Sequence, residues 1–365
     1  MWKHSTQLSN SVLLLTAVAW AGCSSDSIPT GVSEPVDAAA TTAAVSFGPF
    51  PGGTTIFVDV DNTTGVENGT RQHPYNTLSE GLAAASDGST VGLAAGVYAE
   101  DFGFAPNYQI NGLQNFRLLG MGASRTTIRG NHNWSLIQVN NGSAATIKDL
   151  TIERGGHPNH SEGGGIQLLG HAGAVSLTVQ NVILQDNQAV NGGGISAEGT
   201  ATLRMTNVLV ANNRANNGCG GVYLAGASGN VKGIIRNSTI TANAASFQAG
   251  GICSSNGAVL NLVNSIVWNN ELAEIAQPQF GIANVSRSDV GEATFPQRAN
   301  ISAAPLFVDP SHRDYRIRGA SPAVDAGTNI GAPRTDLRGV ARPNDGDGDG
   351  TAITDMGAYE FGKIF

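Results

Sequence analysis

The chain has 365 residues, of which 48 are glycine, and it carries a net charge of −8 at neutral pH. This glycine content argues against repeats built from helices, because each glycine costs about 1 kcal/mol at an interior helix position. The 20 Lys and Arg residues are scattered without a basic run, so nucleic acid and anionic lipid surfaces are poor candidate partners.

The first 22 residues are predicted to be an export signal. An apolar stretch runs from Val12 to Ala21, which is too short to span a bilayer stably. The following Gly22-Cys23 completes a string that resembles the cleavage box of bacterial lipoproteins, and the resemblance implies acylation of Cys23. Trp20 stands where that box usually has Leu, so ordinary cleavage after Ala21 stays open. We expect a cell-envelope lipoprotein or a secreted protein, with the lipid as its only membrane anchor.

Residues 23–53 are predicted to be a flexible tether, because Ser, Thr, Ala, Pro and Gly dominate and little can be buried. Residues 54–361 are expected to form one monomeric domain with an N-terminal cap (54–114), repeat coils (115–277) and a closing segment (278–361). In the cap, the string from Thr77 to Glu80 fits a capping box and predicts a short helix. The helix and the closing segment are expected to cover the unpaired strand edges at the two ends.

A repeat of roughly thirty residues runs through the middle of the chain. Three markers share its period, namely a first row (Asp149, Asn181, Asn207, Asn237, Asn264), a second row (Asn187, Asn213, Asn243, Asn270) and glycine-rich bends before Ile166, Ile195, Val222 and Ile252. Ordinary loops have no reason to keep a common register. The repeat therefore indicates a solenoid.

The repeating units are predicted to be strands, because aliphatic residues alternate within each copy, as at Leu177, Val179, Val182 and Leu184. The predicted fold is all-β, with stacked strands about 4.8 Å apart and equivalent residues in columns. An Asn amide in a turn offers both a donor and an acceptor to the neighbouring coil. We therefore expect a structural ladder of side chains from the first row: Asn181, Asn207, Asn237 and Asn264.

Over most of residues 55–361 the chain resembles the right-handed parallel β-helix proteins of the pectate-lyase-like superfamily. The opening segment is similar to that of many bacterial β-helix proteins, since Pro74-Tyr75 leads into a helix and a strand ending at Tyr98. The closing strings LFVDPSHRDYRIRGASPAVDAG and TDMGAYEF resemble the choice-of-anchor Q domain family of bacterial surface proteins. The resemblance implies a right-handed parallel β-helix with a short N-terminal capping helix and a surface location, and it implies little about activity.

Whether the protein is an enzyme is left open by its outward columns. The resemblance implies that a lyase of this fold would use a Lys or Arg base and a cation, whereas a glycosidase needs two carboxylates about 5 to 9.5 Å apart. Glu153 with Asp186 is the best carboxylate pair for a hydrolase, and Arg154 is the best lyase base. In later coils the same columns contain only uncharged residues: Ala211, Asn212, Thr241, Ala242, Trp268 and Asn269.

A calcium site is predicted near the C-terminus. Carboxylates alternate with glycine on one loop, and such a loop can curl round a hard cation. The expected ligands are Asp345, Asp347, Asp349 and Asp355. The loop is not an EF-hand, because its twelfth position is Met356 rather than Glu.

A weaker metal candidate is the loop that contains His157, His160 and Glu162. These residue types can ligate a metal, but they do not have the spacing of a known metal motif on a rigid element. We expect a solvated surface loop.

The two cysteines of the mature domain are predicted to be free thiols. Relative to the aligned glycines, Cys219 and Cys253 are offset by about 13 Å along an extended strand. A disulfide requires Cα atoms within about 7 Å of each other.

These features favour an exported, lipid-anchored β-helix protein whose polar face contacts extracellular polysaccharide or another cell-surface polymer. A polysaccharide lyase or glycoside hydrolase is the first alternative. An architectural adhesin or spacer is the second.

Overall fold

The computed structural model describes residues 47, 50, 54–100, 108–226 and 230–362. These residues belong to one compact unit, Val45–Phe365. The predicted export signal, Cys23 and most of the predicted tether lie outside the described residues. Within the described ranges, no helix has the length and apolarity needed to cross a membrane.

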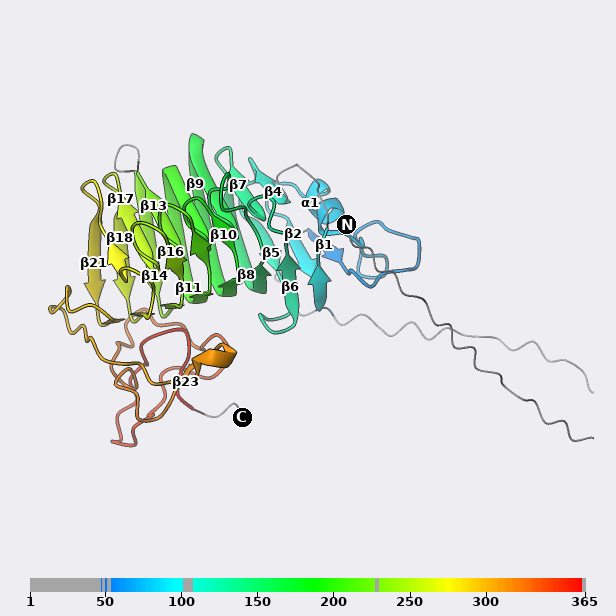
Figure 1. Cartoon of the computed structure of the whole chain (residues 1–365). Coiled ribbons are helices and arrows are strands. Elements are labelled where there is room, and N and C mark those ends of the chain that lie inside the picture. Colours follow the sequence, from blue (N-terminus) through cyan, green and yellow to red (C-terminus); the bar gives the residue numbers. More distant parts are fainter. Residues whose placement is uncertain (1–46, 48–49, 51–53, 101–107, 227–229, 363–365) are drawn as a thin grey trace, which may run out of the picture. The chain divides into compact units, whose positions relative to one another are not determined.

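The described chain winds into successive coils whose strands pair in parallel with the equivalent strands of the coils before and after (Figure 1). The strands form three faces, which the chain visits in the order A, B, C. Face A contains β1 (Thr55–Val58), β2 (Thr90–Leu93), β5 (Phe116–Leu119), β14 (Val231–Arg236), β18 (Val259–Val263) and β21 (Ile282–Ser286). It also contains stretches of three long strands, β8 (Ala144–Glu153), β9 (Ile166–Gln185) and β11 (Ile195–Ala211).

Face B consists of the ends of those long strands with β3 (Gly96–Tyr98), β6 (Thr126–Arg129), β15 (Thr239–Thr241), β19 (Ile266–Trp268) and β22 (Asp289–Val290). Face C consists of the starts of β9 and β11 with β4 (Tyr108–Asn111), β7 (Ile137–Asn140), β13 (Val222–Ala225), β17 (Ile252–Ser255) and β20 (Ile275–Ala276). A small further sheet contains β10 (Gln188–Ala189), β12 (Arg214–Ala215) and β16 (Ala244–Ala245). The predicted solenoid of stacked parallel strands is confirmed.

The core lies inside the coils, where every second residue of each strand is aliphatic. Leu177, Val179, Leu203 and Met205 are at most 1% exposed and occupy equivalent places in neighbouring coils. Burial of one such side chain stabilises the fold by about 1.5 to 3 kcal/mol. The alternation explains why the strand period could be read from the sequence.

The first row turns the chain from face A to face B. Each of its members has a left-handed backbone, with φ of 52° at Asn181 and 53° at Asn207. Asn and Asp tolerate this conformation better than other residues with a side chain. The Asn181 amide donates to the Asp149 carboxylate at 2.7 Å, and the Asn207 amide donates to Asn181 at 3.0 Å. Farther along the row, the side-chain amide nitrogen of Asn237 has no hydrogen-bond partner. The side-chain amide of Asn264 donates to the Thr328 carbonyl of the closing segment.

The second row forms the continuous buried ladder of the solenoid. The Asn213 amide donates to the Leu184 carbonyl at 3.0 Å and to the Asn243 side chain at 2.9 Å. Its own oxygen accepts from both the backbone and the amide of Asn187 at 3.0 Å. The row ends where Asn270 donates to the Glu274 carboxylate at 2.6 Å. Each amide therefore satisfies backbone groups of neighbouring coils that water cannot reach.

The predicted capping helix is present as α1 (Leu78–Ala83). The Thr77 hydroxyl accepts from the Glu80 amide at 3.3 Å, as an N-cap does. Leu78 is fully buried, and a Cβ at Gly81 would lie 2.5 Å from Val58 of β1. Glycine at this position thus lets the helix pack directly on the first coil.

From Phe307 onward the closing segment lies along the outward side of face B. Its earlier residues supply β21 and β22 of the last coil, and Phe295 packs against the core, so only this first part lies at the end of the solenoid. The part from Phe307 contains β23 (Phe307–Asp309), the 3-10 helix η1 (Pro310–His312) and β24 (Asp314–Ile317). Its backbone bonds several coil residues: Ala358 donates to the Thr239 hydroxyl at 3.0 Å, Gly357 donates to the Asn264 carbonyl at 2.8 Å, and the Thr335 carbonyl accepts from Asn207 at 2.6 Å. The physical reason is the composition of face B, whose outward residues in the middle coils are largely apolar and need cover: Ile183, Leu209, Ala211, Ile266 and Trp268.

Cys219 and Cys253 form a disulfide with Cα atoms 5.6 Å apart, so the prediction of free thiols is wrong. The sequence argument measured their offset along an extended strand. Instead, the chain bends at Gly220 and Gly221 before β13 begins at Val222. The bend brings Cys219 back beside Cys253, and both cysteines are fully buried.

Candidate functional site

The predicted catalytic residues are engaged with other parts of the protein. The Glu153 carboxylate pairs with Arg129 at 2.6 Å and accepts from Gln185 at 2.8 Å. Asp186 forms an ion pair with Arg313 of the closing segment. The pKa of Arg313 is raised chiefly by its hydrogen bond to Asp186, with a smaller contribution from the charge of Glu153. Each carboxylate thus has its own guanidinium partner, Arg129 for Glu153 and Arg313 for Asp186.

Arg154, the candidate base, is a turn residue with φ of 58°. Its carbonyl accepts from the His132 amide at 2.9 Å. Burial lowers the pKa of His132, and the charge of Arg154 lowers it further. Two coils farther along the same column, Asn212 bonds the Tyr315 hydroxyl of the closing segment at 3.1 Å. The arrangement holds the closing segment to the solenoid and leaves little room for a polymer there.

The predicted calcium ligands are only partly brought together. Asp345 and Asp347 meet Asp325, and one carboxylate oxygen from each lies within 4.8 Å of the others. Asp349 instead accepts from the Thr351 amide at 2.7 Å. Asp325 lies in the middle of the closing segment, and no sequence spacing connected it with the Gly-Asp loop. Three carboxylates fit a hard cation that prefers oxygen ligands.

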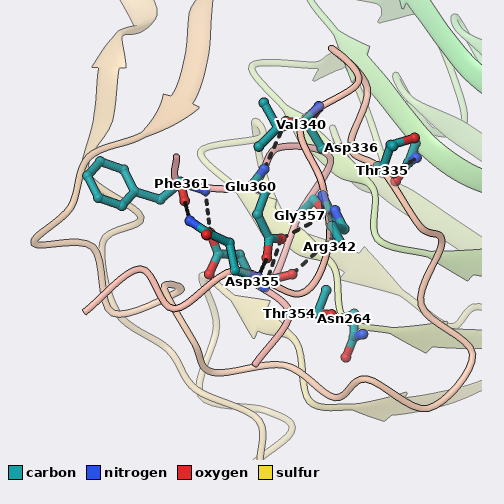
Figure 2. Close-up of polar contacts among 12 residues, drawn as sticks. Asn264, Thr335, Asp336, Val340, Arg342, Thr354, Asp355, Gly357, Glu360 and Phe361 are labelled. Carbon is teal, nitrogen blue, oxygen red and sulfur yellow. Dashed lines mark hydrogen bonds and ion pairs between the residues drawn. The ribbon is translucent and has the colours of Figure 1, made fainter. Parts of the chain in front are cut away.

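Asp355 belongs to a buried ionic network inside the closing segment (Figure 2). Its carboxylate accepts from the Asp325 amide at 2.7 Å and from the Phe361 amide at 2.5 Å. Nearby, Arg342 faces Glu360 at 3.3 Å with both side chains fully buried. Burial raises the pKa of Glu360 and lowers that of Arg342, and the opposite charge of the partner counters both changes. The network holds the segment's irregular backbone together.

The loop with His157, His160 and Glu162 does not gather these side chains around one point. The two imidazoles stack with centroids 3.9 Å apart, and Trp134 lies 4.6 Å from His160. Glu162 accepts from Asn191 at 3.0 Å. Within the described ranges, the three side chains are not a metal-binding group.

Face A carries a concentration of cations that the linear sequence did not reveal. Its outward residues from β8 to β14 are Ala144, Thr146, Lys148, Ser176, Thr178, Gln180, Thr202, Arg204, Thr206, Lys232, Ile234 and Arg236. Arg117 of β5 continues the column of Thr146. These columns contain cations, hydroxyls and amides but no carboxylate. Residues scattered along the chain meet here because the coils place them about 4.8 Å apart.

A groove of about 570 Å³ lies at the edge of face A. One wall is Arg117, Thr146 and Lys148, and the other is the loop from Thr335 to Gly339 of the closing segment. In that loop, Arg338 pairs with Asp336 at 3.0 Å. Asp149 also lines the groove and lies 3.5 Å from Lys148, so the groove has mixed charge and bounds face A on one side.

Parallel strands on three faces around an interior aliphatic core define this molecule as a parallel β-helix protein. The family model for the right handed beta helix region matches residues 110–295, and the chain belongs to this family. Among solved structures, "Crystal structure of pectate lyase Pel9A" is similar, with 13% sequence identity and a TM-score of 0.44, covering 86% of this chain and 98% of that chain. A likeness at this level carries no argument about activity. No curated protein matches the chain.

Proposed function

We propose that the protein is an exported surface β-helix that binds acidic glycans along face A. The observation that carries the proposal is the set of outward columns with Arg117, Lys148, Arg204, Lys232 and Arg236 and no carboxylate. A carboxylated or sulfated polysaccharide offers repeated negative charges at intervals that a row of stacked coils can match. Threonine, glutamine and serine between the cations supply partners for sugar hydroxyls.

The positive charges on face A are opposite in sign to the net charge of the whole chain. The chain has a net charge of −8, so a cluster of cations creates a local field of the opposite sign. Lys148 is partly neutralised by Asp149 at 3.5 Å, and the clearest contribution comes from the exposed Arg204 and Lys232. Arg204 and Lys232 are exposed and lie in neighbouring coils. Exposed charge contacts are screened by salt, so the proposed binding weakens as ionic strength rises.

Two features support the export part of the proposal. The Cys219–Cys253 disulfide suits an oxidising compartment outside the cytosol. The lipoprotein-like string that ends in Cys23 and the resemblance of the closing strings to choice-of-anchor Q proteins favour a lipid-anchored surface location. Mass spectrometry of the mature protein tests the anchor directly, since an acylated Cys23 at the N-terminus supports it and an unmodified terminus contradicts it.

A glycan array tests the binding function. We expect the purified domain to bind carboxylated and sulfated polysaccharides and to leave neutral ones of similar length unbound. A blank array across plant, algal and bacterial acidic polysaccharides would overturn the proposal. Equal binding to neutral polysaccharides would show that the cations of face A do not determine recognition.

A further inference from the structure

A second and smaller pocket, of about 220 Å³, lies on face C. Glu162, His171, Asn191, Glu198 and Tyr223 line it. It shares no lining residue with the groove beside face A. Its volume is below the roughly 300 to 1,000 Å³ of pockets for drug-sized ligands, so it suits one sugar ring rather than a long chain segment.

The coils place these residues together. Glu162 and Asn191 occupy equivalent positions in successive coils and form a parallel bridge. Glu198 of β11 points outward from face C, because its neighbour Ala197 is in the core. Tyr223 of β13 is equivalent to Ser196, two residues before Glu198. Three successive coils thus contribute to one small pocket.

Both carboxylates have an oxygen without a partner. Glu162 uses one oxygen to accept from Asn191 at 3.0 Å, and its other oxygen is buried and unbonded. One oxygen of Glu198 lies 3.7 Å from the His171 ring, and the other is buried and unbonded. The hydroxyl of Ser196, a fully buried residue on the same outward column as Tyr223, is also unbonded. Buried polar atoms of native proteins normally have partners, so these atoms point to a missing donor.

The charges in the pocket define the kind of donor. Burial raises the pKa of Glu162 to about 7, and the charge of Glu198 adds to this effect. Burial also raises the pKa of Glu198, while His171 opposes the change. The raised pKa values mean that the ionised forms of both carboxylates have too little positive charge around them. A ligand that brings a positive charge would relieve both.

A bare metal ion does not fit this requirement. Among the described residues, the one group with ligand atoms close enough to share an ion is Asp325, Asp345 and Asp347. Glu162, Glu198 and His171 do not form such a group, so the pocket lacks the three close ligand atoms that a metal ion would share. An ammonium group carries three N–H donors and one charge, and it can reach separate carboxylates.

We infer that the face C pocket binds the ammonium group of an amino sugar, with the carboxylates of Glu162 and Glu198 accepting its N–H donors. The choice of a sugar rests on the proposed glycan-binding function. Asn191 and Tyr223 line the pocket, where Asn191 would hydrogen-bond the sugar and Tyr223 would pack against the sugar ring. The protein then recognises acidic groups on face A and a free amine on face C, at two independent sites.

Titration calorimetry with two disaccharides tests the inference. The β-linked glucosamine disaccharide carries free amines, and its N,N'-diacetylated form has the same ring shape without their charge. We expect the protein to bind the amine form, to bind the diacetylated form at least 10-fold more weakly, and to lose at least 10-fold in affinity for the amine form in Glu198→Gln. Equal affinity for both disaccharides, or no binding of either, would overturn the inference.

Two variants separate a specific pocket from general attraction to an acidic protein. Glu271→Gln removes one exposed carboxylate elsewhere and is expected to leave amine binding unchanged. Equal losses in Glu271→Gln and Glu198→Gln would contradict the inference. Arg204→Gln, which changes face A alone, is expected to weaken acidic glycans and to leave the amine disaccharide bound, so failure of one site is distinguishable from failure of the other. Matching melting temperatures for the variants show that each remains folded.

Discussion

The Asp186 carboxylate forms an ion pair with the Arg313 guanidinium, although the two residues are 127 positions apart in the chain. Asp186 belongs to a turn of the repeat, and Arg313 belongs to the closing segment. The pair marks the place where the segment meets the flank of the solenoid. A carboxylate that was a candidate for catalysis therefore helps to hold the segment over face B.

Asp186→Asn is expected to lower the free energy of unfolding by less than about 1 kcal/mol, because the pair is partly exposed and screened. Tyr359→Ala is expected to cost about 3 kcal/mol, since it removes a 9% exposed ring packed against the outward side of face B. Chemical denaturation of the two variants measures both values. A larger effect for Asp186→Asn than for Tyr359→Ala would contradict apolar packing as the main attachment of the segment.

Asn213→Ala is expected to destabilise the domain by about 2 to 4 kcal/mol. The change removes the side-chain donor to the Leu184 carbonyl, the acceptor of the Asn187 backbone N–H and one of the two acceptors of the Asn187 side-chain amide. Asn237→Ala is the matched control, because the side-chain amide nitrogen of Asn237 has no hydrogen-bond partner. The expected cost of this change is about 1 to 2 kcal/mol, from placing alanine in a left-handed backbone conformation. If urea denaturation gave the same loss of unfolding free energy for Asn213→Ala and Asn237→Ala, the second row would have no special role in stability.

The coils could be predicted because they repeat. Asn181 and Asn207 mark one corner of successive coils, and alternation around them fixes which side chains enter the core. The cysteines were misjudged for a local reason, since a strand distance was applied to Cys219 across a glycine bend. Strand periodicity carries no information about the path of a turn.

The functional surfaces could be predicted less well, because they join residues that no period connects. Asp325 meets Asp345 through the fold of the closing segment, which does not repeat. Arg204 and Lys232 are far apart in sequence and become neighbours only after the coils stack in register. Glu162 was noticed in a histidine loop, but its relation to Glu198 depends on the start of β11 and on the bridge to Asn191.

The free energy of unfolding is expected to fall as the pH rises from about 5 to 8, in part through Asp289. This residue is fully buried, and burial raises its pKa to about 7 from an ordinary value of 3.8. A raised folded-state pKa means that the folded protein keeps the proton longer than the unfolded chain. The resulting stability is complete below about pH 4 and is lost as the pH rises through 7. The loss of stability expected between pH 5 and pH 7 is about 3 kcal/mol, at about 1.4 kcal/mol per pH unit.

Asp289→Asn checks this assignment, because the amide keeps the acceptor for the Ala303 amide and cannot ionise. The variant should lose stability less steeply than the original protein between pH 5 and pH 8 in thermal melts. Parallel curves for the two proteins over this range would rule out Asp289 as the source.

Calcium is expected to raise the melting temperature, and a chelator is expected to reverse the effect. An ion bound only by the folded state, at 100 times its dissociation constant, stabilises by about 2.7 kcal/mol. The structure changes the expected ligand set, so Asp325→Asn and Asp347→Ala should abolish the response while Asp349→Asn keeps it. Identical melting curves in calcium and in chelator would refute the ion. Loss of the response in Asp349→Asn alone would refute this ligand set.

The most direct test of the account is the affinity of an acidic polysaccharide for variants of face A. Arg204→Gln with Lys232→Gln removes two exposed cations from neighbouring coils, and Arg298→Gln removes one exposed cation outside face A. With polygalacturonate as the probe, we expect the double variant to bind roughly 2- to 30-fold more weakly at low salt, because each of the two exposed charge contacts contributes about 0.2 to 1 kcal/mol. Arg298→Gln should bind like the original protein. Unchanged binding in the double variant, or an equal loss in Arg298→Gln, would contradict the claim that face A is the glycan-binding surface.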